Sequence, residues 1–138
     1  LLALGYVLAM MLGVAVHLEG ATVPAAEALV ALSVVALGAA LVRRAGMPAS
    51  LALALFAVTG ALHGYALGES IVGAEPAPLL AYLTGLAVVQ AAMALGVMLV
   101  GRLALDRAPG ELAAARLLGA GVAGVGLAQF VAQIVPGA

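Results

Sequence analysis

Two side chains in the stretch His63–Ser70 could carry chemistry inside an apolar part of the chain. His63 is one of two histidines, and the carboxylate of Glu69 follows six residues later. An ionisable side chain within a long apolar helix is costly unless it has a partner or faces a wet cavity, so it is a functional candidate by default. An imidazole and a carboxylate together suit a borderline divalent cation such as Ni²⁺, Co²⁺ or Zn²⁺. The pair therefore predicts a transition-metal ligand set.

Geometry restricts this pair. Six residues correspond to about 600° of helix rotation, so His63 and Glu69 share a face only if the helix loosens at Gly64 or Gly68. For His63 the alternative is a hydrogen bond to a neighbouring helix that serves packing alone. For Glu69 the alternative is an ordinary carboxylate in the headgroup region of a membrane.

Glu27 and Gln90 extend the pair into a predicted polar track. Glu27 begins the second apolar segment, and Gln90 lies near the middle of the fourth, at the depth predicted for His63. The track then has carboxylates at one mouth and an imidazole and an amide deeper inside. Carboxylates alone would instead suit Mg²⁺ or Ca²⁺. The alternatives are a helix-dipole partner for Glu27 and interhelical hydrogen bonding for Gln90.

The remaining polar groups near the same mouth look interfacial. His17 lies next to Glu19 at the end of the first apolar segment, and we expect an interfacial side chain there rather than a ligand. Gln129 and Gln133 near the end of the last segment are expected to be interfacial or packing groups.

The composition indicates an integral membrane protein. Of the 138 residues, 67% are hydrophobic and 8% are charged, whereas a soluble domain carries about 25% charged residues. The net charge of -1 argues against nucleic-acid binding, which needs a basic face. The chain has no cysteine, so disulfides, thiolate metal sites and a cysteine nucleophile are excluded. No constellation typical of catalysis occurs, so we expect no enzyme and no tightly bound cofactor.

Five apolar segments predict an all-α, polytopic transmembrane helix bundle that forms a single domain over residues 1–138. The segments are Leu1–Leu18, Ala25–Val42, Leu51–Gly68, Leu79–Gly101 and Leu112–Val135. Each is apolar on nearly every face, and about 18 residues are just enough to cross a bilayer. The links between them are short, so we expect sequential helices to be antiparallel neighbours.

Charge alternates from link to link. The arginines lie in the second and fourth links or just after them, at Arg43, Arg44, Arg102, Arg107 and Arg116. The first and third links and their flanks carry Glu19, Glu27, Glu69 and Glu75 and no arginine. By the positive-inside rule the arginine-bearing links are cytoplasmic. The acidic links and the C-terminus at Ala138 are then predicted to face outward.

Two glycine-rich stretches predict close helix packing. Gly60, Gly64 and Gly68 recur every fourth residue and form a smooth strip along one helix. Gly119–Gly126 is a second such surface rather than a phosphate loop, because no strand precedes it and no Lys follows. Besides the lipid bilayer and the metal ion, the predicted partners are transmembrane helices of other proteins or a second copy, bound through these faces.

Two stretches resemble signatures of the HupE/UreJ family of membrane proteins. His63–Glu75 resembles the signature of the third helix, and Pro24–Glu27 with Ala31–Gly38 resembles the signature at the start of the second. Leu80–Tyr82 and the helix that holds Gln90 are similar to the next helix of that family. The resemblance implies a small bacterial inner-membrane protein of about six spans, associated with nickel supply to hydrogenase and urease and with cobalt in some relatives.

The resemblance also assigns residues. Glu27, His63 and Glu69 match motif positions one by one and would inherit the metal role. The His- and Asp-bearing signature of the family's first helix has no match, so we expect five visible spans and six in the native chain. Tyr65, Leu67 and Gln90 stand where many members carry further histidines.

The predicted function is uptake of a divalent transition-metal ion through the polar track, with nickel first and cobalt second. The alternative is a structural or accessory subunit of a larger membrane complex. In that case the glycine-rich faces would bind partner helices, and His63 would be a packing or pigment-ligand residue.

Overall fold

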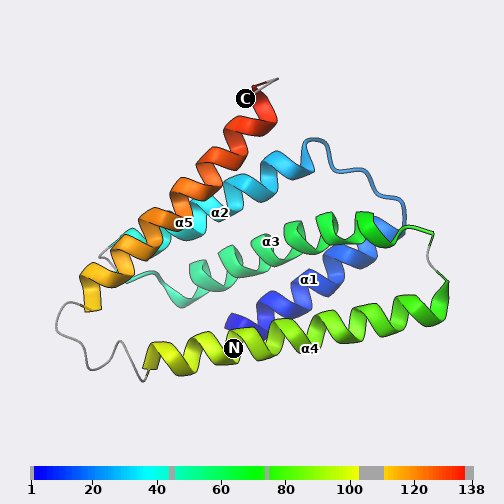
Figure 1. Ribbon diagram of the computed structural model, residues 1–138, viewed down its shortest axis with the longest axis horizontal. Helices are drawn as coiled ribbons and strands as arrows, with labels where there is room; N and C mark the ends of the chain where they lie inside the picture. The colour runs from blue at the N-terminus through cyan, green and yellow to red at the C-terminus, as the bar shows by residue number, and fades with distance from the viewer. Residues whose placement is uncertain (1, 44–45, 74, 103–110, 136–138) are drawn as a thin grey trace.

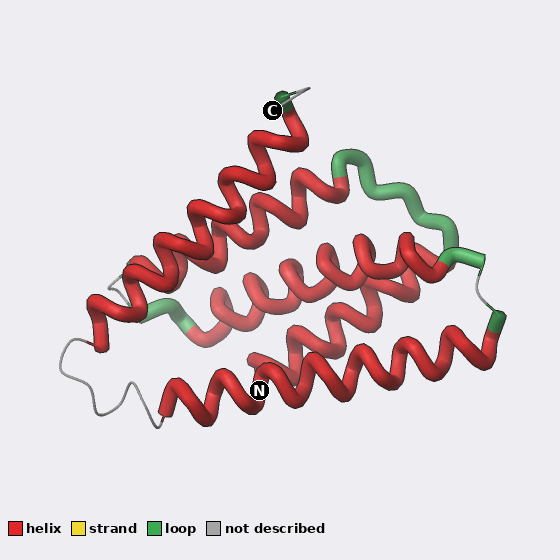
Figure 2. Tube along the Cα trace, viewed as in Figure 1, coloured by secondary structure: helices red, strands yellow, loops and turns green. Residues whose placement is uncertain are grey.

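A computed structural model describes residues 2–43, 46–73, 75–102 and 111–135. These residues form helices and connecting turns without a strand, which confirms the predicted all-α fold (Figures 1 and 2). The helices are α1 (Leu2–Leu18), α2 (Ala26–Val42), α3 (Ala49–Gly68), α4 (Pro76–Val100) and α5 (Glu111–Ile134). A single 3₁₀ turn, η1 (Glu69–Ile71), continues α3.

The helix boundaries follow the prolines. α3 begins directly after Pro48, and α4 has Pro76 in its first turn, where the missing N–H would have no partner and the fixed φ suits a helix. Both helices therefore start slightly before the predicted Leu51 and Leu79. The other predicted boundaries agree with the structure to within a residue at most ends.

Among the residues that the structure describes, three stretches are long and apolar enough to cross a membrane, namely Ala49–Ile71, Pro78–Val100 and Ala113–Ile134. α1 and α2 are apolar helices of 17 residues each. At 1.5 Å per residue such a helix reaches about 25 Å, close to the thickness of the hydrocarbon core. Together with the apolar composition, this makes the chain a membrane protein.

The helices form two tightly packed pairs rather than a chain of sequential neighbours. α1 packs most extensively on α3, and α2 packs most extensively on α5. α2 also contacts α3, as expected, and α4 contacts α1. Among sequential helices in the described part of the chain, only α2 and α3 are in substantial contact, so the prediction that sequential helices are neighbours is wrong for the other three pairs. α1 instead runs beside α3 in the same direction (Figure 1).

Glycine explains the first pair. A Cβ atom at Gly64 would overlap the backbone carbonyl of Met10, and a Cβ at Gly13 would overlap that of Ala61. The backbones of α1 and α3 thus approach each other from both sides, which only residues without a side chain permit. The predicted close contact along the Gly60, Gly64 and Gly68 strip is confirmed, with α1 as its partner.

The second pair uses the other glycine-rich stretch in part. A Cβ at Gly126 would lie 2.7 Å from the backbone nitrogen of Val35, and one at Gly119 would lie 2.8 Å from the carbonyl oxygen of Gly38. Gly121 and Gly124 have nothing within 4 Å of such a Cβ. One face of α5 is therefore used within the chain, and the prediction of a partner helix or second copy stays open for the other.

The fold places Glu27 and Glu69 at the same end of the bundle, called here the acidic end. α1 and α3 end where α2 and α4 begin, while α2 and α4 end where α3 and α5 begin (Figure 1). Glu27 and Glu69 thus lie at one end of the bundle and Arg43 and Arg102 at the other. The predicted positions Arg44 and Arg107 lie outside the described residues.

Candidate metal-binding site

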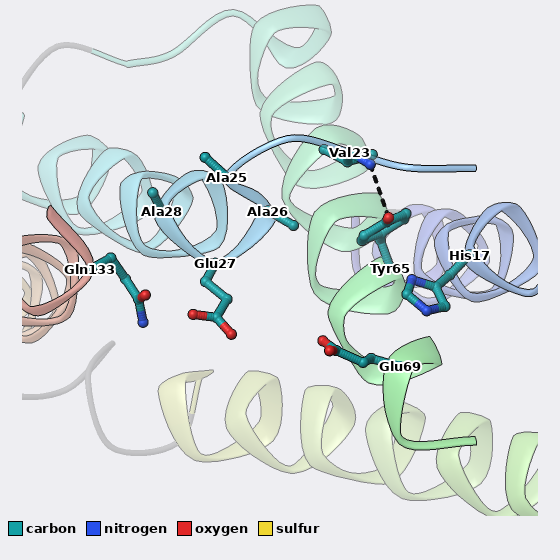
Figure 3. A pocket seen from close by; sticks show the side chains of 9 residues that line it. All are labelled: His17, Val23, Ala25, Ala26, Glu27, Ala28, Tyr65, Glu69 and Gln133. Atoms are coloured by element: carbon teal, nitrogen blue, oxygen red, sulfur yellow. Dashed lines mark hydrogen bonds between the residues drawn. The ribbon is translucent and has the colours of Figure 1, made fainter. Parts of the chain in front are cut away.

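A pocket of about 350 Å³ opens at the acidic end of the bundle. Its side walls come from α1, α2, α3 with η1, and α5, and its polar lining residues are His17, Glu27, Tyr65, Glu69 and Gln133. In Figure 3 the carboxylates of Glu27 and Glu69 point toward one another. Two predicted site residues that are far apart in the sequence therefore line one cavity.

Glu27 reaches the pocket from the first turn of α2. The helix follows Ala25, whose φ of 53° lies in the left-handed region that residues other than glycine rarely adopt. This turn redirects the chain from the α1–α2 link into α2. A carboxylate in the first turn also interacts favourably with the helix dipole, so the predicted dipole role and a metal role are compatible at this position.

Tyr65 fixes the link above the pocket. Its hydroxyl donates a hydrogen bond of 2.8 Å to the carbonyl oxygen of Ala21. It accepts one of 2.9 Å from the backbone N–H of Val23 (Figure 3). Both bonds join residues more than 40 positions apart in the sequence. α3 thereby holds the link between α1 and α2 in place.

His17 packs between α1 and α3 at the edge of the pocket. Its ring meets the ring of Tyr65 edge to face, with the centroids 4.5 Å apart. A Cβ at Gly68 would lie 2.8 Å from the Cβ of His17, so the missing side chain at Gly68 makes room for this imidazole. Nδ1 of His17 is buried and has no hydrogen-bond partner among the described residues.

His63 lies outside this pocket. Its Nδ1 is 2.9 Å from the backbone carbonyl oxygen of Thr59, one turn earlier in α3, and its ring centroid is 6.3 Å from that of Tyr6. With the hydrogen on Nδ1, this bond fixes the ring and leaves the lone pair of Nε2 free. The same arrangement orients histidine ligands in many metal sites.

Gln90 lies against a different cavity. This apolar hollow of about 610 Å³ is lined by α4 residues together with Tyr6, Leu37 and Phe56. The structure therefore brings Glu27 and Glu69 together, whereas Gln90 does not line their pocket. Within the described part of the chain, no three His, Cys, Asp or Glu side chains already converge closely enough to hold a metal ion.

Sequence reasoning assigned no role in the site to three residues that line the pocket. Tyr65 is four positions before Glu69, so the two share a helix face, and that spacing was the available signal. His17 and Gln133 were interpreted as interfacial or packing groups. Their place in the pocket depends on the α1–α3 pairing and on the approach of α5 to α2, for which the sequence offers no spacing rule.

A family model described as HupE / UreJ protein matches residues 1–129. The chain belongs to the HupE/UreJ family. The family is associated with nickel and cobalt uptake in general and is known for metal transport and accessory roles rather than for catalysis. Searches of the curated proteins and of the solved structures each found no match. The match spans every residue that the sequence predicted for the site of this HupE/UreJ protein, from Glu27 to Gln90.

Proposed function

We propose that this HupE/UreJ protein takes up a divalent transition-metal ion, nickel first and cobalt second, across the bacterial inner membrane. The observation that carries the proposal is the pocket shared by Glu27 and Glu69 at the acidic end of the bundle. Two carboxylates from different helices around one cavity form a mouth that attracts cations and supplies oxygen ligands.

His63 is the proposed ligand deeper in the bundle. Its hydrogen bond to the Thr59 carbonyl turns a lone pair of Nε2 outward from that bond, so the imidazole is oriented as a ligand before an ion arrives. A site that combines imidazole nitrogen with carboxylate oxygen favours nickel, cobalt or zinc over magnesium. Gln90 of α4 is proposed as a further polar group at depth.

The proposed orientation follows from charge. Arg43, Arg102 and Arg116 belong to the end of the bundle opposite the pocket, and arginine-rich links stay in the cytoplasm. The carboxylate mouth then faces outward, with the C-terminus at Ala138 on the same side. An ion that enters at the mouth would move inward along the direction expected for uptake.

One observation favours the alternative of an accessory subunit. None of the residues in the membrane-crossing window of α4 is buried, and α1 is its main contact. Because most of the surface of α4 is left uncontacted by this chain, a helix of another protein can pack against it. In that case the chain would support a larger complex and would move no metal by itself.

Nickel accumulation in cells tests the proposal. Cells that produce the protein should accumulate more nickel than cells with an empty vector. Glu27→Gln with Glu69→Gln should raise the nickel concentration needed for half-maximal uptake at least about fivefold, because a mouth charge concentrates ions.

Glu19→Gln is the matched control. It removes one negative charge from the neighbouring link at a residue that does not line the pocket. At matched membrane expression, Glu19→Gln should behave as wild type. Equal nickel dependence of the double variant and Glu19→Gln would contradict the proposed mouth.

A further inference from the structure

We propose that His17 is a nitrogen ligand of the outer pocket and that this nitrogen makes the pocket select transition-metal ions over magnesium and calcium. The inference rests on the proposed function, since it names the ligand that gives the mouth its selectivity. It assigns His17 a role distinct from that of His63, which lies deeper in the bundle.

The position of His17 supports the assignment. The residue lines the same pocket as Glu27 and Glu69, and it comes from α1, whereas the carboxylates come from α2 and η1. Three donors from three separate elements can surround an ion, which neighbours along one helix cannot do as readily. In Figure 3 the imidazole lies on the same side of the cavity as Glu69, with Glu27 across from it.

The surroundings of the ring support it further. The ring of His17 meets Tyr65 edge to face, and the side chain packs closely on the backbone at Gly68. These two contacts restrict its orientation. Tyr65 is itself fixed by two hydrogen bonds to the α1–α2 link. A ligand held by packed neighbours loses little freedom when an ion binds.

The two nitrogens of His17 differ in their access to the pocket. Nδ1 is buried and has no hydrogen-bond partner in the described residues, so an ion in the pocket cannot reach it. Since His17 lines the pocket, Nε2 is the nitrogen that we assign to the ion.

The carboxylates can complete the site by moving. Glu27 and Glu69 are both exposed, and their flexible side chains point toward one another across the pocket (Figure 3). We infer that the imidazole is the fixed point and that the carboxylates close around the ion. This closure accounts for the absence of a preformed three-ligand cluster in the described part of the chain.

The selectivity follows from ligand chemistry. Magnesium and calcium prefer oxygen ligands and gain little from an imidazole. Nickel and cobalt bind imidazole nitrogen well, and nickel binds more tightly than cobalt in most mixed sites. Removing the nitrogen should therefore weaken nickel binding selectively, while removing a carboxylate should weaken both classes of ion.

Equilibrium binding to the purified full chain in detergent tests the inference. Nickel and magnesium salts are titrated separately by calorimetry into wild type, His17→Gln and His17→Phe. Both variants lack a good ligand nitrogen, and His17→Phe keeps an aromatic ring against Tyr65. We expect both to weaken nickel binding at least about tenfold and to change magnesium binding less than about threefold.

Glu19→Gln serves as the control and should bind both ions as wild type. Unchanged nickel affinity in both His17 variants would overturn the inference, as would equal losses for nickel and magnesium or a wild-type chain that binds no nickel. If a variant has a lowered melting temperature, the ratio of its nickel affinity to its magnesium affinity decides, because misfolding lowers both affinities alike.

Cellular uptake separates the two proposals. If wild type takes up nickel and His17→Gln keeps the same selectivity for nickel over magnesium, only the role of His17 is overturned. Lack of nickel uptake by wild type would overturn the proposed function itself, whatever the calorimetry gives.

Discussion

α3 and α4 are both long apolar helices that carry a polar residue near the middle, yet the fold treats them differently. α3 packs closely on α1 through Gly60 and Gly64 and carries His63 and Tyr65 into defined contacts. α4 has Gly85 and Gly96, but nothing lies within 4 Å of a Cβ at either position. Gln90 accordingly lines an open apolar hollow and has no defined polar contact among the described residues.

The difference shows what positions chemistry in this bundle. Apolar character is shared by every helix and cannot select one neighbour over another, because lipid tails are as apolar as leucine. Close approach of two backbones is specific, since it needs regularly spaced glycines on one face of a helix. α3 has such glycines and carries His63 and Tyr65, whereas α4 lacks them and carries Gln90.

The largest expected effect is at Gly64. Gly64→Ala places a Cβ against the carbonyl of Met10, where no flexible side chain can give way, so α1 and α3 must separate. We expect a loss of about 3 kcal/mol in the free energy of unfolding. Melting of the purified protein in detergent measures it.

Gly85→Ala on α4 is the matched control. A Cβ there meets nothing within 4 Å, so the gain in helix propensity of up to about 1 kcal/mol should dominate. Equal melting temperatures for the two variants would mean that α3 is no more closely packed than α4.

A smaller effect is expected at Tyr65. Tyr65→Phe keeps the ring but removes the hydroxyl that bonds Ala21 and Val23. The loss of stability should be about 1–2 kcal/mol. The backbone N–H of Val23 should also exchange faster with solvent, as measured by hydrogen–deuterium exchange.

Tyr82→Phe on α4 is the control for this change. It should change the free energy of unfolding by no more than about 0.5 kcal/mol, the usual range for substitutions away from a specific interaction. Unaltered exchange at Val23 in Tyr65→Phe would show that the link does not depend on α3.

The smallest effect on stability is expected from cysteines placed for labelling. Arg43→Cys and Glu75→Cys replace exposed residues at opposite ends of the bundle. A membrane-impermeant thiol reagent added to intact cells should label position 75 and spare position 43. Labelling of both from one side would contradict the topology derived from the arginines.

Much of the fold could be predicted from the sequence. Long apolar segments interrupted by Pro24, Pro48 and Pro76 place the helices, because their length and breakers are local properties. The strip from Gly60 to Gly68 predicted close packing, but it could not name α1 as the partner. Partner choice depends on complementary glycines such as Gly13, which carries no periodic signal of its own.

The candidate site could be predicted in part. Glu27 and Glu69 were found by residue type and motif, and the structure places them on one pocket. Their common position depends on helix starts and ends meeting at one end of the bundle, which charge alternation already indicated. The role of Tyr65 could not be predicted, because its hydrogen bonds reach a link more than 40 residues away.

Transport by the chain alone is the central claim, and proteoliposomes test it most directly. Purified protein is reconstituted into vesicles that trap a fluorescent nickel indicator, and nickel is added outside under an imposed membrane potential. We predict protein-dependent entry of nickel that His63→Gln abolishes, because glutamine keeps polarity and size but is a poor nickel ligand. Entry no faster than in protein-free vesicles, or equal entry through wild type and His63→Gln, would contradict the account.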